Sequence, residues 1–76
     1  MNQAVYTLDA RGLNCPLPIL KTKKMLKGMS SGQILEVMAT DPGSIADMTA
    51  FCNQTGNELV SQSNQGDVYT FEIKVA

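Results

Sequence analysis

One cysteine in this chain stands where a thiol can do chemistry. Cys15 lies in the run Asn14-Cys15-Pro16-Leu17-Pro18. A residue that precedes proline is disfavoured in the α region, so we expect Cys15 to be the N-cap of a helix whose first residue is Pro16. The amides and dipole at a helix N-terminus favour the thiolate and can lower a cysteine pKa below its free value of about 8.5. The sequence therefore predicts a nucleophilic thiol.

The two prolines strengthen this prediction. A helix start leaves several backbone N–H groups without partners in the helix, and Pro16 and Pro18 each remove one. The amides of Cys15 and Leu17 remain, so a sulfur atom can take the capping position at little cost. No acidic residue follows nearby in the sequence to raise the pKa again. The alternative role of a free cysteine, packing as a small hydrophobe, fits Cys52 better.

Composition excludes several other kinds of site. The 76 residues include no histidine and two cysteines, which excludes mixed Cys/His zinc sites, Ser/His or Cys/His catalysis and a disulfide framework. A net charge of −1 gives no general attraction to nucleic acid or anionic membranes. Residues 1–4 show no basic region followed by an apolar run, and no apolar stretch is long enough to span a bilayer. We expect a single cytoplasmic domain over residues 1–76.

The elements that position Cys15 follow from the hydrophobic pattern. It predicts the order β-α-β-α-β-β, with strands at residues 5–9, 34–40, 58–63 and 68–75 and helices at 16 to about 29 and from 41–44 to Gly56. Residues 64–67 read as a hairpin turn. This order favours an α+β fold, a two-layer sandwich with two helices on one face of a mixed four-stranded sheet. A right-handed first crossover makes the first two strands parallel.

Each predicted helix has one apolar face. The face of the first helix that should pack on the sheet consists of Ile19, Thr22, Met25, Leu26 and Met29. The buried stripe of the second helix should consist of Ile45, Met48, Thr49 and Cys52. The side chain of Asp41 or Ser44 is expected to cap the second helix.

The outer face of the first helix has two interpretations. It carries apolar and basic side chains near Cys15, namely Leu17, Leu20, Lys21, Lys24 and Lys27. They can form a docking surface for an acidic partner, with apolar anchors and a basic rim to which Arg11 adds. They can equally be a solvated basic face with two incidental leucines. The sequence leaves both open.

The run from Asp9 to Lys21, Asp-Ala-Arg-Gly-Leu-Asn-Cys-Pro-Leu-Pro-Ile-Leu-Lys, resembles the signature of the TusA, or SirA-like, family of sulfur-carrier proteins. The similarity continues at residues 40–42, 51–52 and 57–60, so it covers essentially the whole chain. It implies the two-layer fold described above. It also implies that Cys15 is the catalytic residue and that the motif residues around it position the thiol, namely Gly12, Asn14, Pro16 and Pro18.

Membership would imply that Cys15 carries sulfane sulfur as a transient persulfide, with no other cofactor and no metal. The donor would be a cysteine desulfurase or rhodanese, and the acceptor a protein with a reactive cysteine, similar to DsrE or TusD. Such a protein is a sulfurtransferase-like carrier rather than a stand-alone multi-turnover enzyme. Known destinations of the sulfur are tRNA thiolation, molybdenum-cofactor assembly and sulfur oxidation. The tRNA-thiolating members tend to carry an acidic residue between the two prolines of the motif. This sequence has Leu17 at that position and is more similar to the members found beside sulfur-oxidation proteins.

Two other classes of function remain as alternatives. A regulatory or RNA-binding module could use the lysines of the first helix, although the pI of about 5.0 argues against direct binding of nucleic acid. A thiol redox protein would need a resolving cysteine. Only Cys52 could serve, and its place on a predicted apolar stripe argues against this role.

Overall fold

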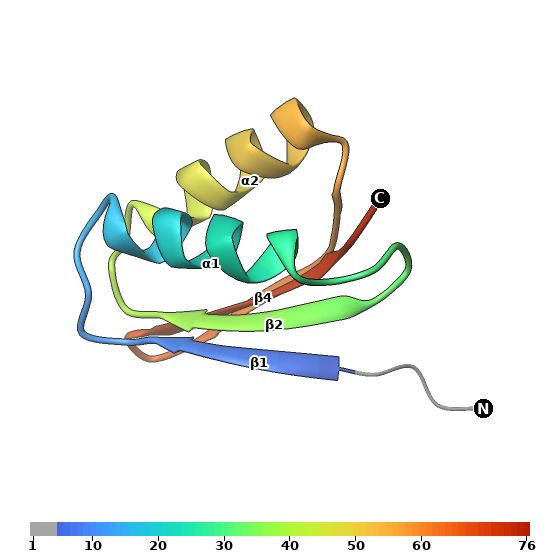
Figure 1. The fold of residues 1–76 in the computed structure, drawn as a ribbon. Coiled ribbons are helices and arrows are strands. Elements are labelled where there is room, and N and C mark those ends of the chain that lie inside the picture. The colour runs from blue at the N-terminus through green and yellow to red at the C-terminus, as the bar shows by residue number, and fades with distance from the viewer. Residues whose placement is uncertain (1–4) are drawn as a thin grey trace.

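The computed structural model describes residues 5–76, so the expectation about residues 1–4 lies outside the described part of the chain. The elements follow the predicted order: β1 (Val5–Ala10), α1 (Leu17–Lys27), β2 (Ile34–Ala39), α2 (Ser44–Thr55), β3 (Glu58–Gln65) and β4 (Val68–Lys74). Both helices lie over the same face of the sheet (Figure 1). The predicted α+β sandwich is confirmed.

The sheet topology brings two distant loops together. The strand order is β1-β2-β4-β3, with β1 parallel to β2 and the other two pairs antiparallel. The predicted parallel pairing is therefore confirmed. Because Ala10 pairs with Ala39, β1 and β2 end at the same edge of the sheet. The loop after β1, which holds Cys15, thus starts beside the loop that leads into α2.

The core lies between the sheet and the helices. The central strands β2 and β4 bury alternate residues, as the period of a strand requires. The buried apolar residues are Ala10, Leu26, Leu35, Val37, Ala39, Met48, Cys52, Phe71 and Ile73. Phe71 and Ile73 of β4 lie on the face of the sheet that the helices cover.

Helix α1 packs on the sheet through the predicted face. Thr22 and Leu26 are buried, and Ile19, Met25 and Met29 pack against the core. The Thr22 hydroxyl donates to the Pro18 carbonyl at 2.8 Å, which satisfies it inside the protein. The helix ends at Lys27 rather than near Met29, because the chain turns at Gly28.

Helix α2 presents a different stripe from the one predicted. Met48 and Cys52 are buried as expected, but Ile45 and Thr49 are exposed. The line of contact runs in steps of four residues, from Ser44 through Met48 to Cys52, which turns the other two toward solvent. The Thr49 hydroxyl on that side donates to the Ile45 carbonyl at 2.8 Å.

The ends of α2 and of the last two strands differ in part from the predicted ends. Gly43 is the N-cap of α2 and no side chain caps it, so the expected caps, Asp41 and Ser44, are wrong. Gly56 ends the helix with φ of 82°, as predicted. Strand β3 extends into the predicted turn, which is reduced to residues 66–67, and β4 begins at Val68 as predicted. Within residues 5–76, neither helix has the length and apolar character needed to cross a membrane.

Candidate functional site

Cys15 lies in a turn, one residue before the N-cap of α1. The helix begins at Leu17 with Pro16 as its N-cap, so the prediction that Cys15 caps a helix starting at Pro16 is wrong. The Leu17 amide donates to the Asn14 carbonyl at 2.9 Å. This hydrogen bond closes a turn over residues 14–17 and delays the start of the helix. The Cys15–Pro16 peptide bond within the turn is cis.

The two amides left by the prolines are already engaged. The Cys15 N–H donates to Asp41 Oδ2 at 3.0 Å, and the Leu17 N–H donates to the Asn14 carbonyl. Neither donor is therefore directed at the sulfur. The expected stabilisation of a thiolate by these amides is absent.

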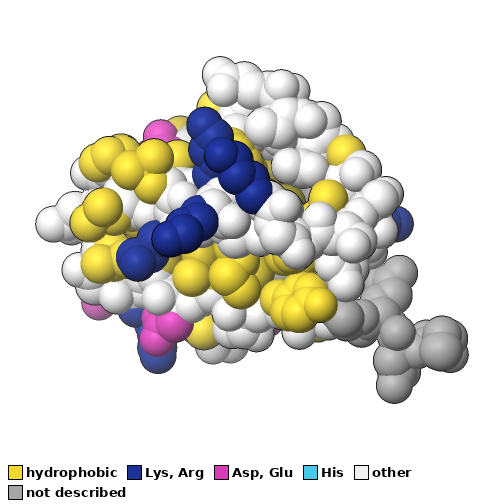
Figure 2. Space-filling model, viewed as in Figure 1, with side chains coloured by type: hydrophobic (Ala, Val, Ile, Leu, Met, Phe, Trp, Pro, Cys, Tyr) yellow, Lys and Arg dark blue, Asp and Glu magenta, His cyan; other side chains and the backbone are white. Residues whose placement is uncertain are grey.

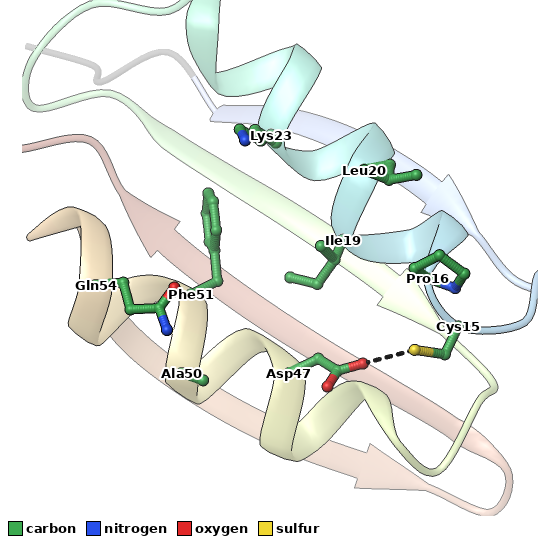
Figure 3. A pocket seen from close by; sticks show the side chains of 9 residues that line it. All are labelled: Cys15, Pro16, Ile19, Leu20, Lys23, Asp47, Ala50, Phe51 and Gln54. Atoms are coloured by element: carbon green, nitrogen blue, oxygen red, sulfur yellow. Dashed lines mark hydrogen bonds between the residues drawn. The ribbon is translucent and has the colours of Figure 1, made fainter.

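The Cys15 thiol instead donates a hydrogen bond to a carboxylate. Its Sγ lies 3.1 Å from Oδ2 of Asp47, in the first turn of α2 (Figure 3). This hydrogen bond raises the pKa of the Cys15 thiol, and partial desolvation and the negative charges of Asp47 and Asp41 raise it further. The expectation of a lowered pKa is wrong, because the fold brings in acidic residues from a distant segment.

A groove between the two helices opens at Cys15. Its volume is about 330 Å³. Figure 3 shows the sulfur pointing toward Asp47 at one end of the groove, with side chains from both helices along it. The lining residues are Cys15, Pro16, Ile19, Leu20 and Lys23 on one side and Asp47, Ala50, Phe51 and Gln54 on the other. The groove can therefore receive a reacting group beside the thiol.

Gly12 connects the loop of Cys15 to the end of β2. Its φ of 81° lies in the left-handed region, which favours glycine. Its amide donates to Thr40 Oγ1 at 2.9 Å. Together with the bond from the Cys15 amide to Asp41, this contact holds the β1–α1 loop against the β2–α2 loop.

The candidate docking residues fall into separate places. Leu17 and Leu20 are 44% and 51% exposed, and Lys21 and Lys24 are exposed on α1. Figure 2 shows basic side chains over α1 beside apolar surface at its N-terminal end. Of these four residues, Leu20 lines the groove.

Arg11 is directed elsewhere. Its Nε lies 2.9 Å from Oδ1 of Asp9, and the two exposed side chains form an ion pair. The hydrogen bonds from the Arg11 side chain and amide lower the pKa of Asp9 to about 2. The structure thus pairs Arg11 with Asp9 and does not place it in the groove.

Sequence reasoning missed most of the α2 side of the site. Asp47 is 32 residues from Cys15, and Ala50 and Gln54 of α2, like Lys23 of α1, line the groove without having been singled out. A usable signal was present, because the predicted parallel strands must end at one edge of the sheet. The start of the second helix could have been searched for groups facing Cys15. Within residues 5–76, no three His, Cys, Asp or Glu side chains gather as metal ligands.

The fold and the site define a small two-layer α/β protein that presents a thiol at its surface. A family model described as Sulfurtransferase TusA matches residues 6–75. The chain is 61% identical over 67 residues to the sulfur carrier protein TusA of Allochromatium vinosum, with 88% of both chains covered. The chain belongs to the TusA family of sulfur carriers.

Other relatives agree with this assignment. A putative sulfur carrier protein of Neisseria meningitidis serogroup A is 50% identical over 68 residues, covering 90% of this chain and 92% of the relative. The putative sulfur carrier protein YrkI of Bacillus subtilis is 49% identical over 67 residues, covering 88% and 89%. The crystal structure of a SirA-like protein from Desulfitobacterium hafniense superposes with a TM-score of 0.79 at 22% identity, covering 93% and 96%. This last similarity shows a shared fold.

Proposed function

We propose that this protein accepts a sulfane sulfur as a persulfide on Cys15 and transfers it to a cysteine of an acceptor protein. The observation that carries the proposal is the exposed Cys15 thiol at the end of the inter-helix groove. The other thiol, Cys52, is 4% exposed and packs in the core. Family membership supplies the cargo, since the curated relatives are named as sulfur carriers.

The reaction is an exchange of sulfur between thiols. The Cys15 sulfur attacks the outer sulfur of a donor persulfide, so that the S–S bond of the donor breaks and a new S–S bond forms on Cys15. The proton of the Cys15 thiol ends on the thiolate that leaves the donor. Discharge repeats these steps, with the acceptor thiol attacking the outer sulfur on Cys15. No net oxidation occurs, so the exchange consumes neither an oxidant nor a reductant.

A carrier must meet both a donor and an acceptor. We assign the donor role to a cysteine desulfurase or rhodanese and the acceptor role to a DsrE- or TusD-like protein, and we place the exchange in the cytoplasm. Leu17 and Leu20 are exposed apolar side chains beside the thiol, and the lysines of α1 surround them. Apolar anchors with a charged rim suit a docking surface for complexes that form and dissociate repeatedly. Gly12, Asn14, Pro16 and Pro18 shape the turn that presents the thiol.

The test is the mass of the protein after incubation with a cysteine desulfurase and cysteine, or with rhodanese and thiosulfate. The wild type should gain the mass of one sulfur atom, and dithiothreitol should remove it. Cys15→Ser should gain nothing, whereas the matched variant Cys52→Ser should still load. Sulfur retained by Cys15→Ser, or no sulfur on the wild type, would overturn the proposal.

A further inference from the structure

Asp47 lies where its negative charge disfavours ionisation of the Cys15 thiol. Its Oδ2 accepts the thiol hydrogen bond at 3.1 Å. A carboxylate can accept this bond only while the sulfur keeps its proton. When the proton leaves, the same two atoms become neighbouring negative charges, which repel each other. The structure therefore holds the sulfur in its less nucleophilic form.

The other charged groups near Cys15 do not cancel this effect. Asp41, in the loop before α2, accepts the Cys15 amide through its carboxylate and adds further negative charge. Lys23, on α1, lines the same groove, but it lies two helical turns beyond the turn of Cys15 and donates no hydrogen bond to Asp47 among the contacts of residues 5–76. The end of the groove at Cys15 is thus acidic, while the outer face of α1 is basic.

We propose that Asp47 is a positioning residue that keeps Cys15 protonated in the free carrier, and that a cationic side chain of the partner releases the thiolate by pairing with Asp47. This inference rests on the proposed sulfur-carrier function. The carboxylate lines the open groove, so a partner side chain that enters the groove reaches it. One cation placed there interacts favourably with both the carboxylate and the sulfur anion. The thiol is therefore more reactive where a partner is docked.

The hydrogen bond to Asp47 also fixes the direction of the Cys15 sulfur. Asp47 draws the Sγ atom of Cys15 across the end of the groove, as Figure 3 shows. A sulfur held in this way faces a group that enters between α1 and α2. Release from Asp47 would then free a sulfur that already points toward the incoming persulfide.

The first test is the pH dependence of Cys15 alkylation by iodoacetamide in the free protein. The variant Asp47→Asn keeps the shape and the acceptor oxygen but removes the charge. Removing the charge lowers the pKa of the thiol and so raises the thiolate fraction at neutral pH, and the lower basicity of the thiolate offsets only part of this gain. We expect alkylation near neutral pH to accelerate about threefold and its midpoint to shift to lower pH.

The matched control is Glu58→Gln, which removes one negative charge at the opposite end of the sheet. In the strand register, Glu58 of β3 lies opposite Lys74 of β4, and Lys74 lies opposite Ile34, the first residue of β2. This variant should react as the wild type does. Identical pH profiles for wild type and Asp47→Asn, with both folded by circular dichroism, would overturn the role of Asp47.

The second test addresses the partner's cation. The rate at which Cys15 reacts with cystamine, a cationic disulfide, is compared with its rate with neutral hydroxyethyl disulfide. Attraction to the Asp47 carboxylate should favour cystamine, and Asp47→Asn should reduce the ratio of the two rates by about fivefold. An unchanged ratio would overturn release by a cation. Both tests use the unloaded protein, so they can fail while sulfur loading succeeds. They can also succeed while sulfur loading fails.

Discussion

The two cysteines of this chain show how one side chain acquires two characters. Cys15 is exposed and donates its hydrogen bond to Asp47, whereas Cys52 is 4% exposed and packs in the core. The pKa of both thiols is raised above the ordinary value. The causes differ. A hydrogen bond to a carboxylate leads at Cys15, and burial acts at Cys52.

This difference decides which of the two thiols a partner can make more nucleophilic. Burial of Cys52 lasts as long as the protein is folded, so its thiol stays unreactive in the native state. The effect of Asp47 on Cys15 is local and ends when another charge neutralises the carboxylate. A raised pKa is therefore compatible with a carrier thiol when its cause can be removed by a partner.

The largest expected difference between the two cysteines is their rate of alkylation in the native protein. Iodoacetamide should modify Cys15 directly, whereas Cys52 must wait for the protein to open. With an unfolding free energy of about 5 kcal/mol, the open fraction is below about one in a thousand. Cys52 should therefore react at least about a thousandfold more slowly, and urea should abolish the difference. Peptide mass mapping measures both rates. Equal native rates would contradict the contrast.

A smaller effect is expected on stability. Cys52→Ala removes a buried sulfur and leaves a small cavity, which should lower the free energy of unfolding by about 1 kcal/mol. Cys15→Ala, at an exposed turn, should change it by less than about 0.5 kcal/mol. Urea unfolding followed by circular dichroism gives both values. A larger loss from Cys15→Ala would mean that the thiol bond to Asp47 holds the turn together.

The smallest effect concerns the ion pair in the loop of Cys15. Arg11→Ala should raise the pKa of Asp9 from about 2 toward the ordinary value, as an NMR titration would show. Since the pKa of Asp9 is depressed in the folded state, the pair stabilises the fold above the unfolded pKa, and this contribution is lost as the pH falls toward about 2. Both side chains are exposed, so the change in stability should be small.

The same variant sharpens the comparison of the thiols. Arg11 is not among the causes of the Cys15 pKa shift. Arg11→Ala should therefore leave the alkylation rate of Cys15 unchanged. An altered rate would show that the charge of the Asp9–Arg11 pair reaches the sulfur.

Local pattern was enough to predict most of the fold. The helical period placed Thr22 and Leu26 on the packing face of the first helix, where both are buried. Prediction failed where the burial of a side chain depends on how its helix is oriented on the sheet, as at Ile45 and Thr49. This orientation is set by packing against the sheet, which the helical period alone does not specify.

The site was predicted in part for a related reason. Cys15 stands out in the sequence because of the prolines beside it. Its amide and its thiol, however, bond to Asp41 and Asp47, which lie 26 and 32 residues away. A prediction based on neighbours in the chain assigned those interactions to the helix start and obtained the wrong direction for the pKa.

The two contacts that join the loops have a consequence for protein engineering. The Gly12 amide bonds to the Thr40 hydroxyl and the Cys15 amide bonds to the Asp41 carboxylate. The cysteine turn is therefore not a portable cassette. Grafted onto another scaffold without the loop that follows β2, it would lose the acceptors that shape it. A designer who wishes to transplant this thiol must move both loops and the parallel strand pair that brings them together.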